Sequence, residues 1–164
     1  MPMKKRALAV LVAGAALAAG YLGPRVPAPA WADDIQATVD ARRAMMKEMA
    51  REMKAIADAL DAKSTDMASM QKHAELVQAD AAKIPTLFPT GSSADDLPGK
   101  THAKPEIWQN FDGFKANAAT LGTEAGKLAD VAQSADTAAV AAQFDQTGRN
   151  GCGACHKQFR LPLQ

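Results

Sequence analysis

Apolar residues recur every three or four positions through four long stretches of this 164-residue chain. They are Ile35, Val39, Met46, Met49, Met53, Ile56 and Leu60 in the first stretch; Met67, Met70, Ala74, Val77, Ala81 and Ile84 in the second; Ile107, Phe111, Phe114, Ala118, Leu121, Ala125 and Leu128 in the third; and Val140, Phe144, Gly151, Cys155 and Phe159 in the fourth. This spacing predicts four helices with narrow apolar seams, and no stretch alternates as a β-strand does. We therefore expect an all-α fold, an antiparallel left-handed four-helix bundle.

Residues that start or stop helices stand at the ends of these stretches. Ser64 is placed to cap the second helix and Pro85 to stop it, while Pro105 suits the first turn of the third helix. Ser134 or Asp136 can start the fourth helix.

One long connection, the twenty residues from Pro85 to Lys104, separates the second helix from the third. An irregular segment of this length is uncommon in a compact domain. We expect it to pack over the bundle, with Leu87, Phe88 and Leu97 as its anchors.

The N-terminus has the order of a secretory signal peptide. A basic start (KKR) precedes an uncharged apolar run from Ala7 to Gly23 and a small-x-small site that ends at Ala32. We therefore expect residues 1–32 to be a cleaved signal peptide and residues 33–164 to form one domain in the periplasm, without a membrane attachment. An uncleaved membrane anchor is the alternative, because the apolar run approaches the length that spans a bilayer.

Cleavage changes the net charge of the protein. The precursor carries +1, but all four charged residues that precede Asp33 are basic. The mature chain therefore has 15 basic and 18 acidic residues, a net charge of −3. Without a basic cluster it has no electrostatic footprint for nucleic acid, and that class of partner is excluded.

The apolar seams contain few large side chains. The mature chain has no tyrosine and a single tryptophan, and many seam positions are alanine or glycine, with six methionines filling others. Because protein interiors are close-packed, a bundle lined by small residues either brings its helices very close or encloses another group. An organic cofactor would supply the missing apolar volume.

Candidate chemistry lies near the C-terminus, in the segment NGCGACHKQFR, which contains both cysteines of the chain. A thiol–disulfide oxidoreductase carries Cys-x-x-Cys at the start of a helix that follows a strand, and no strand is expected here. A structural zinc site needs four ligands, so His73 or His102 would have to join Cys152, Cys155 and His156 without a second motif. Cys-x-x-Cys-His is also the attachment motif of c-type haem, and this interpretation uses every residue of the motif.

On a helix, Cys152, Cys155 and His156 share one face, because three and four residues make about one turn. The two thiols are then placed to bond the porphyrin, and His156 to bind iron as the proximal ligand. Three glycines remove side-chain bulk where the ring would approach the backbone: Gly148, Gly151 and Gly153. Together with the secretory signal and the underfilled bundle, the motif predicts one covalently attached haem c.

These motifs make the chain resemble class II cytochromes c, the group of cytochrome c′ and its low-spin, methionine-ligated relatives. The resemblance covers the whole mature chain, with ARRAMMKEMAREMKAI in the first helix, PTLFPTGSSADDLPGKT and IWQNFDGF in the middle, and CGACHKQFR at the end. It implies a four-helix bundle around one haem c, attached through Cys152 and Cys155 and bound by His156.

The resemblance assigns roles to further residues. It implies that Arg160 lies on the proximal side of the haem, and that Phe159 replaces a tyrosine common in the family. It places Arg42 near a haem propionate, which suits an arginine in an apolar seam because a buried guanidinium needs an anionic partner. The alternative is that the Arg42 side chain extends from the seam to water.

The resemblance also places Met46 on the distal side of the iron. In methionine-ligated relatives a methionine there completes the coordination and gives an electron carrier, whereas in cytochrome c′ proper an apolar residue leaves the iron open to nitric oxide or carbon monoxide. Packing in the methionine-rich seam is the alternative for Met46, and Met45 or Met49 would replace it if the helix register differed. His73 and His102 are expected at the surface, with His102 the next candidate for a sixth ligand.

Two functions follow, in order of preference. The first is periplasmic electron transfer by an iron with His156 and Met46 as axial ligands, and the second is gas binding by a five-coordinate iron. No acid–base pair or nucleophile arrangement indicates substrate turnover, so we expect a protein that is not an enzyme. The resemblance also allows a homodimer through the first two helices, and the acidic net charge favours redox partners with basic docking faces.

Overall fold

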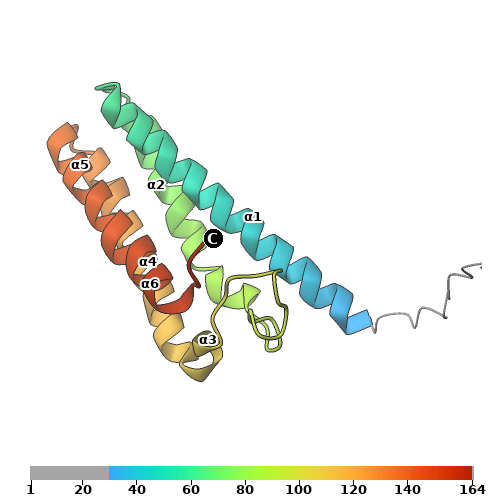
Figure 1. Ribbon diagram of the computed structural model, residues 1–164. Coiled ribbons are helices and arrows are strands. Elements are labelled where there is room, and N and C mark those ends of the chain that lie inside the picture. Colours follow the sequence, from blue (N-terminus) through green and yellow to red (C-terminus); the bar gives the residue numbers. More distant parts are fainter. Residues whose placement is uncertain (1–29, 164) are drawn as a thin grey trace, which may run out of the picture.

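The computed structural model describes residues 30–163, which form a bundle of long helices (Figure 1). The elements are α1 (Ala30–Asp61), α2 (Met67–Ala81), the 3₁₀ turn η1 (Ile84–Leu87), α3 (Glu106–Gln109), α4 (Phe111–Ala132), α5 (Thr137–Gln146), the π-helical segment η2 (Thr147–Gly153) and α6 (Ala154–Phe159). The predicted all-α four-helix bundle is confirmed, since the described residues hold no strand beyond an isolated bridge between Ala103 and Arg160. Of the predicted signal peptide, residues 1–29 lie outside the described residues.

Two of the helices, α2 and α5, begin at acidic caps. Asp66, and not the predicted Ser64, caps α2, because its carboxylate accepts the Ser69 N–H at 3.0 Å while the Ser64 hydroxyl accepts only the N–H of Asp66. Asp136 caps α5 by accepting two backbone N–H groups. Ser134, the other candidate, donates its hydroxyl to the preceding helix instead. A carboxylate satisfies the free N–H groups of a first turn and also favours the positive end of the helix dipole.

The third predicted helix is interrupted near its start. One turn, α3, follows Pro105 as expected, and the chain then leaves helical geometry at Asn110, with φ −135° and ψ 59°. The Asn110 side chain accepts the N–H of Gly113 at 3.1 Å and so starts α4 as a new helix. Asparagine competes for backbone groups in this way, and periodicity alone does not reveal such a break.

The small residues of the seams serve two purposes. Part of the missing bulk reflects close helix packing, since a Cβ added at Gly122 of α4 would lie 3.7 Å from the Cβ of Ala81 on α2. Another part reflects a cavity near α6, described below. The small residues of the seams therefore give close helix packing at one place and a cavity at another, along the same helices.

Gly151 of η2 packs closely against Leu121 of α4. A Cβ at this position would lie 2.7 Å from Cδ1 and 3.1 Å from Cα of Leu121. The glycine therefore admits the neighbouring helix, and its expected role beside a haem ring stays a prediction. The π turn is the local reason for the weak apolar spacing of the fourth stretch, because an i→i+5 turn shifts the later residues around the helix.

Gly151→Ala is expected to lower the free energy of unfolding by about 1–3 kcal/mol, because the backbone of Leu121 cannot give way as a flexible side chain would. Gly148→Ala is the matched control in the same segment, where an added Cβ meets nothing within 4 Å. It is expected to be neutral or to stabilise the protein by up to about 1 kcal/mol. Urea titrations of both variants measure the difference, and equal stabilities would contradict the assigned contact.

The long connection packs over the bundle as predicted, with Phe88 as its main anchor. The Phe88 ring lies 4.6 Å from that of Phe114, and the Trp108 indole N–H reaches the backbone oxygens of Phe88 and Pro89 at 3.2 and 3.1 Å. Leu97, like Leu87, is only half-buried. Between residues 30 and 163, no helix has both the length and the apolarity needed to cross a bilayer.

Candidate functional site

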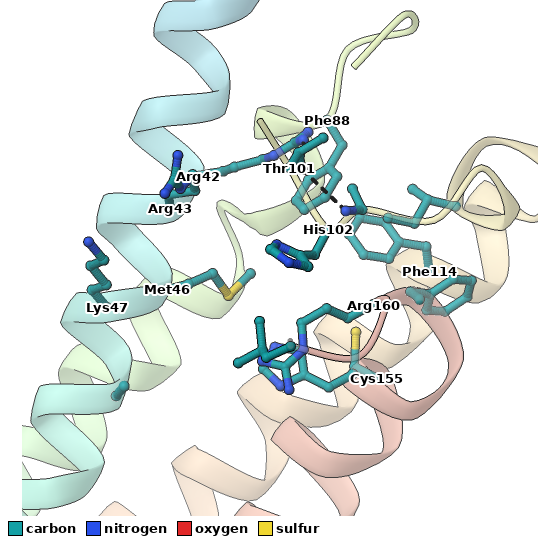
Figure 2. A pocket seen from close by; sticks show the side chains of 16 residues that line it. Arg42, Arg43, Met46, Lys47, Phe88, Thr101, His102, Phe114, Cys155 and Arg160 are labelled. Carbon is teal, nitrogen blue, oxygen red and sulfur yellow. Dashed lines mark hydrogen bonds between the residues drawn. The ribbon is translucent and has the colours of Figure 1, made fainter. Parts of the chain in front are cut away.

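A cavity of about 420 Å³ opens between α1 and α6 and is bounded by the loop that leads to α3 (Figure 2). Its volume lies in the range of small-molecule and cofactor sites. The lining residues are Arg42, Arg43, Met46, Lys47, Ala50, Phe88, Thr101, His102, Ala103, Ile107, Phe114, Cys155, His156, Phe159, Arg160 and Leu163. They are apolar, polar or basic, and none of them is an aspartate or a glutamate.

Met46 is the methionine of α1 that faces the cavity. Figure 2 shows its thioether projecting from α1 into the space in front of the wall that carries Cys155. Met45 is half-buried and absent from the lining, and Met49 is 6% exposed within the core. The helix register therefore brings Met46, and not Met45 or Met49, to the cavity, and its role as an iron ligand stays a prediction.

The opposite wall carries Cys155 and His156, both from α6. Burial, with a smaller contribution from the positive charge of Arg160, lowers the pKa of the His156 imidazole. The neutral ring, which has a free nitrogen lone pair, is the form that binds a metal. The local environment of His156 therefore favours its ligand form at neutral pH.

Cys152 is placed differently from the rest of its motif. It lies in η2, packs against the apolar core and is not part of the cavity lining. The prediction that one helical face presents all three motif residues stays a prediction for Cys152, which lies in the π turn while Cys155 and His156 lie in α6. Cys155, which lines the cavity, packs against the same core cluster as Cys152.

The environment of the thiols argues against the two other interpretations of the motif. Burial raises the pKa of the Cys155 thiol to about 11, with a further contribution from Cys152, and burial also raises the pKa of Cys152. A redox-active dithiol needs a lowered pKa at the attacking sulfur. Across residues 30–163, no three His, Cys, Asp or Glu side chains come together as a metal-binding group, so the zinc interpretation has no ligand set.

Arg42 is buried at the cavity wall, at 3% exposure. Its guanidinium donates to the Ser92 hydroxyl at 2.9 Å, the Ser92 carbonyl at 2.7 Å and the Thr101 hydroxyl at 2.5 Å, and it lies 4.7 Å from the Phe88 ring centroid. Burial lowers its pKa to about 10, so it remains a cation at neutral pH. The alternative that Arg42 extends to water is wrong. Three of its five N–H donors are used, and its role toward a propionate stays a prediction.

The C-terminal segment closes one side of the cavity. Arg160 pairs with Ala103 in an antiparallel bridge, and the Leu161 N–H donates to the His102 carbonyl at 2.8 Å. Both Arg160 and His102 are exposed, yet both reach the cavity lining (Figure 2). His102 is therefore at the surface, as predicted, and also within the site.

Two further residues considered in the sequence analysis, Phe159 and His73, are held by packing and by an ion pair. Phe159 is 2% exposed and packs edge-to-face on Phe114 with ring centroids 5.4 Å apart, so it gives the cavity an apolar wall. His73 lies outside the lining. Its imidazole meets the Glu52 carboxylate at 2.5 Å between α2 and α1 and is therefore half-buried, not free at the surface.

The sequence missed the residues that the loop and the polar side of α1 bring to the cavity. Thr101 and Ala103 come from the long connection, where no periodic pattern marks the inward side chains. Arg43 and Lys47 lie on α1 next to Arg42 and Met46, outside the apolar seam. Their basic character was the one available signal, and it was hidden by the acidic net charge of the chain.

The site fits the predicted cofactor. It combines an apolar cavity of suitable volume, a neutral histidine on one wall, a thioether on the other and a Cys-x-x-Cys-His motif at its edge. Soft sulfur and imidazole ligands with two nearby cysteines suit an iron porphyrin attached by thioether bonds. The fold and the site together define a c-type haem protein of the four-helix class.

Comparisons with known proteins agree with this class. The family model described as "Cytochrome C'" matches residues 37–160. A cytochrome c-556 from Agrobacterium tumefaciens (strain II Chrys) is 36% identical over 124 residues, which cover 75% of this chain and 96% of the relative. A cytochrome c′ from Rhodospirillum rubrum is 31% identical over 131 residues, covering 80% of this chain and 86% of the relative.

Solved structures give the same result. The crystal structure of cytochrome c′ from Thermochromatium tepidum superposes with a TM-score of 0.70 at 29% identity, covering 78% of this chain and 97% of that one. A cytochrome c′ with an unusual ligand-controlled dimer dissociation superposes with a TM-score of 0.71 at 26% identity and the same coverage. The chain belongs to the cytochrome c′ family, whose members bind haem c covalently, and the resemblance read from its motifs is confirmed.

Proposed function

We propose that this chain is a periplasmic electron-transfer cytochrome in which His156 and Met46 bind the haem iron from opposite sides, with Cys152 and Cys155 as the points of attachment. When bound, the haem supplies an iron that is oxidised and reduced by one electron. The observation that carries the proposal is the position of Met46. Its thioether extends into the cavity from α1, and His156 lines the cavity from α6.

The protein's own residues prepare this site in three ways. Apolar side chains such as Ile107, Phe114 and Phe159 exclude water from the inner walls. Burial keeps the His156 ring neutral and able to coordinate. A thioether is a soft ligand that favours the reduced state of iron and therefore raises the reduction potential. A site with both ligands in place keeps the same coordination in both oxidation states, which suits electron transfer.

Absorption spectra of the purified holoprotein test this proposal. We expect a low-spin spectrum whose reduced form has sharp α and β bands and does not change when carbon monoxide is added. A broad high-spin spectrum that shifts with carbon monoxide would contradict the proposal and favour a five-coordinate iron that binds gases, with Met46 as a packing residue. Absence of any haem band would contradict both functions.

The periplasmic location is part of the same proposal and rests on the N-terminal sequence. Expression of the full chain in a bacterium that matures c-type cytochromes is expected to yield a periplasmic protein. Its N-terminal residue is then expected to be Asp33, as determined by Edman degradation. An intact N-terminus in the membrane fraction would support the uncleaved anchor instead.

A homodimer through α1 and α2 is also proposed. A dimer whose dissociation is controlled by ligand is described for one of the similar structures. In this chain Leu76 of α2 is 44% exposed, the only exposed large apolar side chain in the described residues outside the C-terminal tail. Sedimentation of the holoprotein is expected to give twice the chain mass, and Leu76→Glu is expected to give monomers. A monomeric wild type at high protein concentration would contradict the dimer.

A further inference from the structure

The lining of the cavity is strongly basic, although the mature chain is acidic. Arg42, Arg43, Lys47 and Arg160 all line it, and no carboxylate does. Lys157, next to His156, is exposed on the same helix. A net charge of −3 therefore hides a local concentration of positive charge around the cavity.

We propose that the mouth of the cavity, formed by Arg43, Lys47, Arg160 and the tail residues Leu161 and Leu163, is the docking surface for a redox partner with an acidic face. This inference rests on the proposed electron-transfer function. It reverses the sequence-based expectation of a basic partner, because docking depends on the charge near the site of contact and not on the sum over the chain.

The charges at the mouth are available to a partner. Four of the eight exposed lysines elsewhere in the described residues form an ion pair with a nearby carboxylate, as Lys54 does with Asp58 at 2.7 Å. Lys47 and Arg160 have no carboxylate within 4.0 Å among the described residues, and Arg43 meets only the exposed Asp40, at 3.9 Å. A haem has two propionates, so these can offset at most two of the four cations of the lining.

An apolar centre accompanies the cations. Leu163 lines the cavity and is 66% exposed, and Leu161 is 37% exposed. The bond from the Leu161 N–H to the His102 carbonyl holds the tail beside the opening. Exposed apolar side chains surrounded by charges of one sign are typical of small, transient interfaces, in which electrostatics steers the encounter and apolar contact gives close approach.

Oxidation of the reduced holoprotein by two small probes of opposite charge measures the local charge. Hexacyanoferrate(III) and tris(1,10-phenanthroline)cobalt(III) each accept one electron from the ferrous iron in a stopped-flow experiment. If the mouth is the docking surface, the rate with the anionic probe falls as salt rises and the rate with the cationic probe increases or stays constant. The acidic net charge alone predicts the opposite salt dependence of the rate for each probe.

Lys47→Glu and Lys54→Glu form a matched pair for the same experiment. Both lysines are exposed on α1 and both changes alter the net charge equally, but only Lys47 lines the cavity. At low salt, Lys47→Glu is expected to slow the reaction with hexacyanoferrate(III) about fivefold and Lys54→Glu less than about twofold. A reduced acidic [2Fe–2S] ferredoxin, as donor to the ferric holoprotein, is expected to show the same difference between the variants.

Two kinds of result overturn the inference. Rates that follow the net charge, or equal effects of the two lysine variants, would show that the mouth is not the docking surface while electron exchange itself persists. Absence of electron exchange with either probe at any salt concentration would instead show that the electron-transfer function fails, and the docking surface with it. The first result leaves the low-spin spectrum unchanged, so the two failures are distinguishable.

Discussion

Replacing Met46 by alanine is expected to convert a low-spin, carbon monoxide-insensitive protein into a high-spin one that binds carbon monoxide. Alanine has no donor atom, and its side chain is too short to reach across the cavity that Met46 enters. Loss of the thioether is also expected to lower the reduction potential, because the soft ligand no longer favours the reduced iron. Absorption spectroscopy with a carbon monoxide titration, followed by potentiometry, measures both effects.

Two neighbouring methionines serve as controls for this variant. Met45→Ala removes a half-buried side chain outside the cavity and is expected to leave the spectrum unchanged. Met49→Ala removes a core side chain that is 6% exposed, so it is expected to lower the free energy of unfolding by about 2–5 kcal/mol without changing the spectrum at low temperature. A Met46→Ala protein that stays low-spin would contradict Met46 ligation and would direct attention to His102.

Arg42→Ala is expected to be among the most destabilising single changes in the protein, at about 3–5 kcal/mol. The change removes three hydrogen bonds and leaves Ser92 and Thr101 buried without their charged donor. Buried groups that lose such a partner carry the full cost of desolvation, and the space left by the guanidinium adds a cavity. Urea unfolding of the holoprotein, followed by circular dichroism, measures the loss.

Arg43→Ala is the control for Arg42→Ala because it removes the same side chain one position along α1. The Arg43 side chain is 56% exposed, and its ion pair with Asp40 is long, so a change within about 0.5 kcal/mol is expected. If Arg42→Ala lowers the free energy of unfolding by less than about 1 kcal/mol, Ser92 and Thr101 have found other hydrogen-bond partners. The assigned role of Arg42 in holding the loop would then be wrong.

The regular apolar spacing made the helices and their packing predictable. The seams of α1, α2 and α4 are continuous enough to give the bundle, and the position of Met46 on its helix follows from the same register. Where polar side chains compete for backbone groups the prediction was poorer. Asn110 divides the third helix through its own bond to Gly113, which depends on a local geometry that spacing does not encode.

The candidate site was predictable where a motif defines it and unpredictable where tertiary contacts do. Cys155, His156 and Met46 line the cavity, while Cys152 lies in a π turn, which has no simple sequence signal. The partners of Arg42 lie 50 and 59 residues away along the chain, in a loop without periodicity. Long-range contacts of this kind depend on how the loop closes, so the residues alone did not reveal them.

The long connection joins the two walls of the cavity mechanically. Arg42 fastens the loop to α1 through Ser92 and Thr101, and two residues farther on the loop pairs with Arg160 at the end of α6. The same segment thus acts as a spacer between the helix that carries Met46 and the helix that carries His156. In the proposed electron carrier, a spacer anchored at both ends would keep Met46 and His156 at a constant separation when the charge at the site changes. Such a centre undergoes little structural rearrangement with each electron gained or lost, and the energy of rearrangement limits the rate of electron transfer.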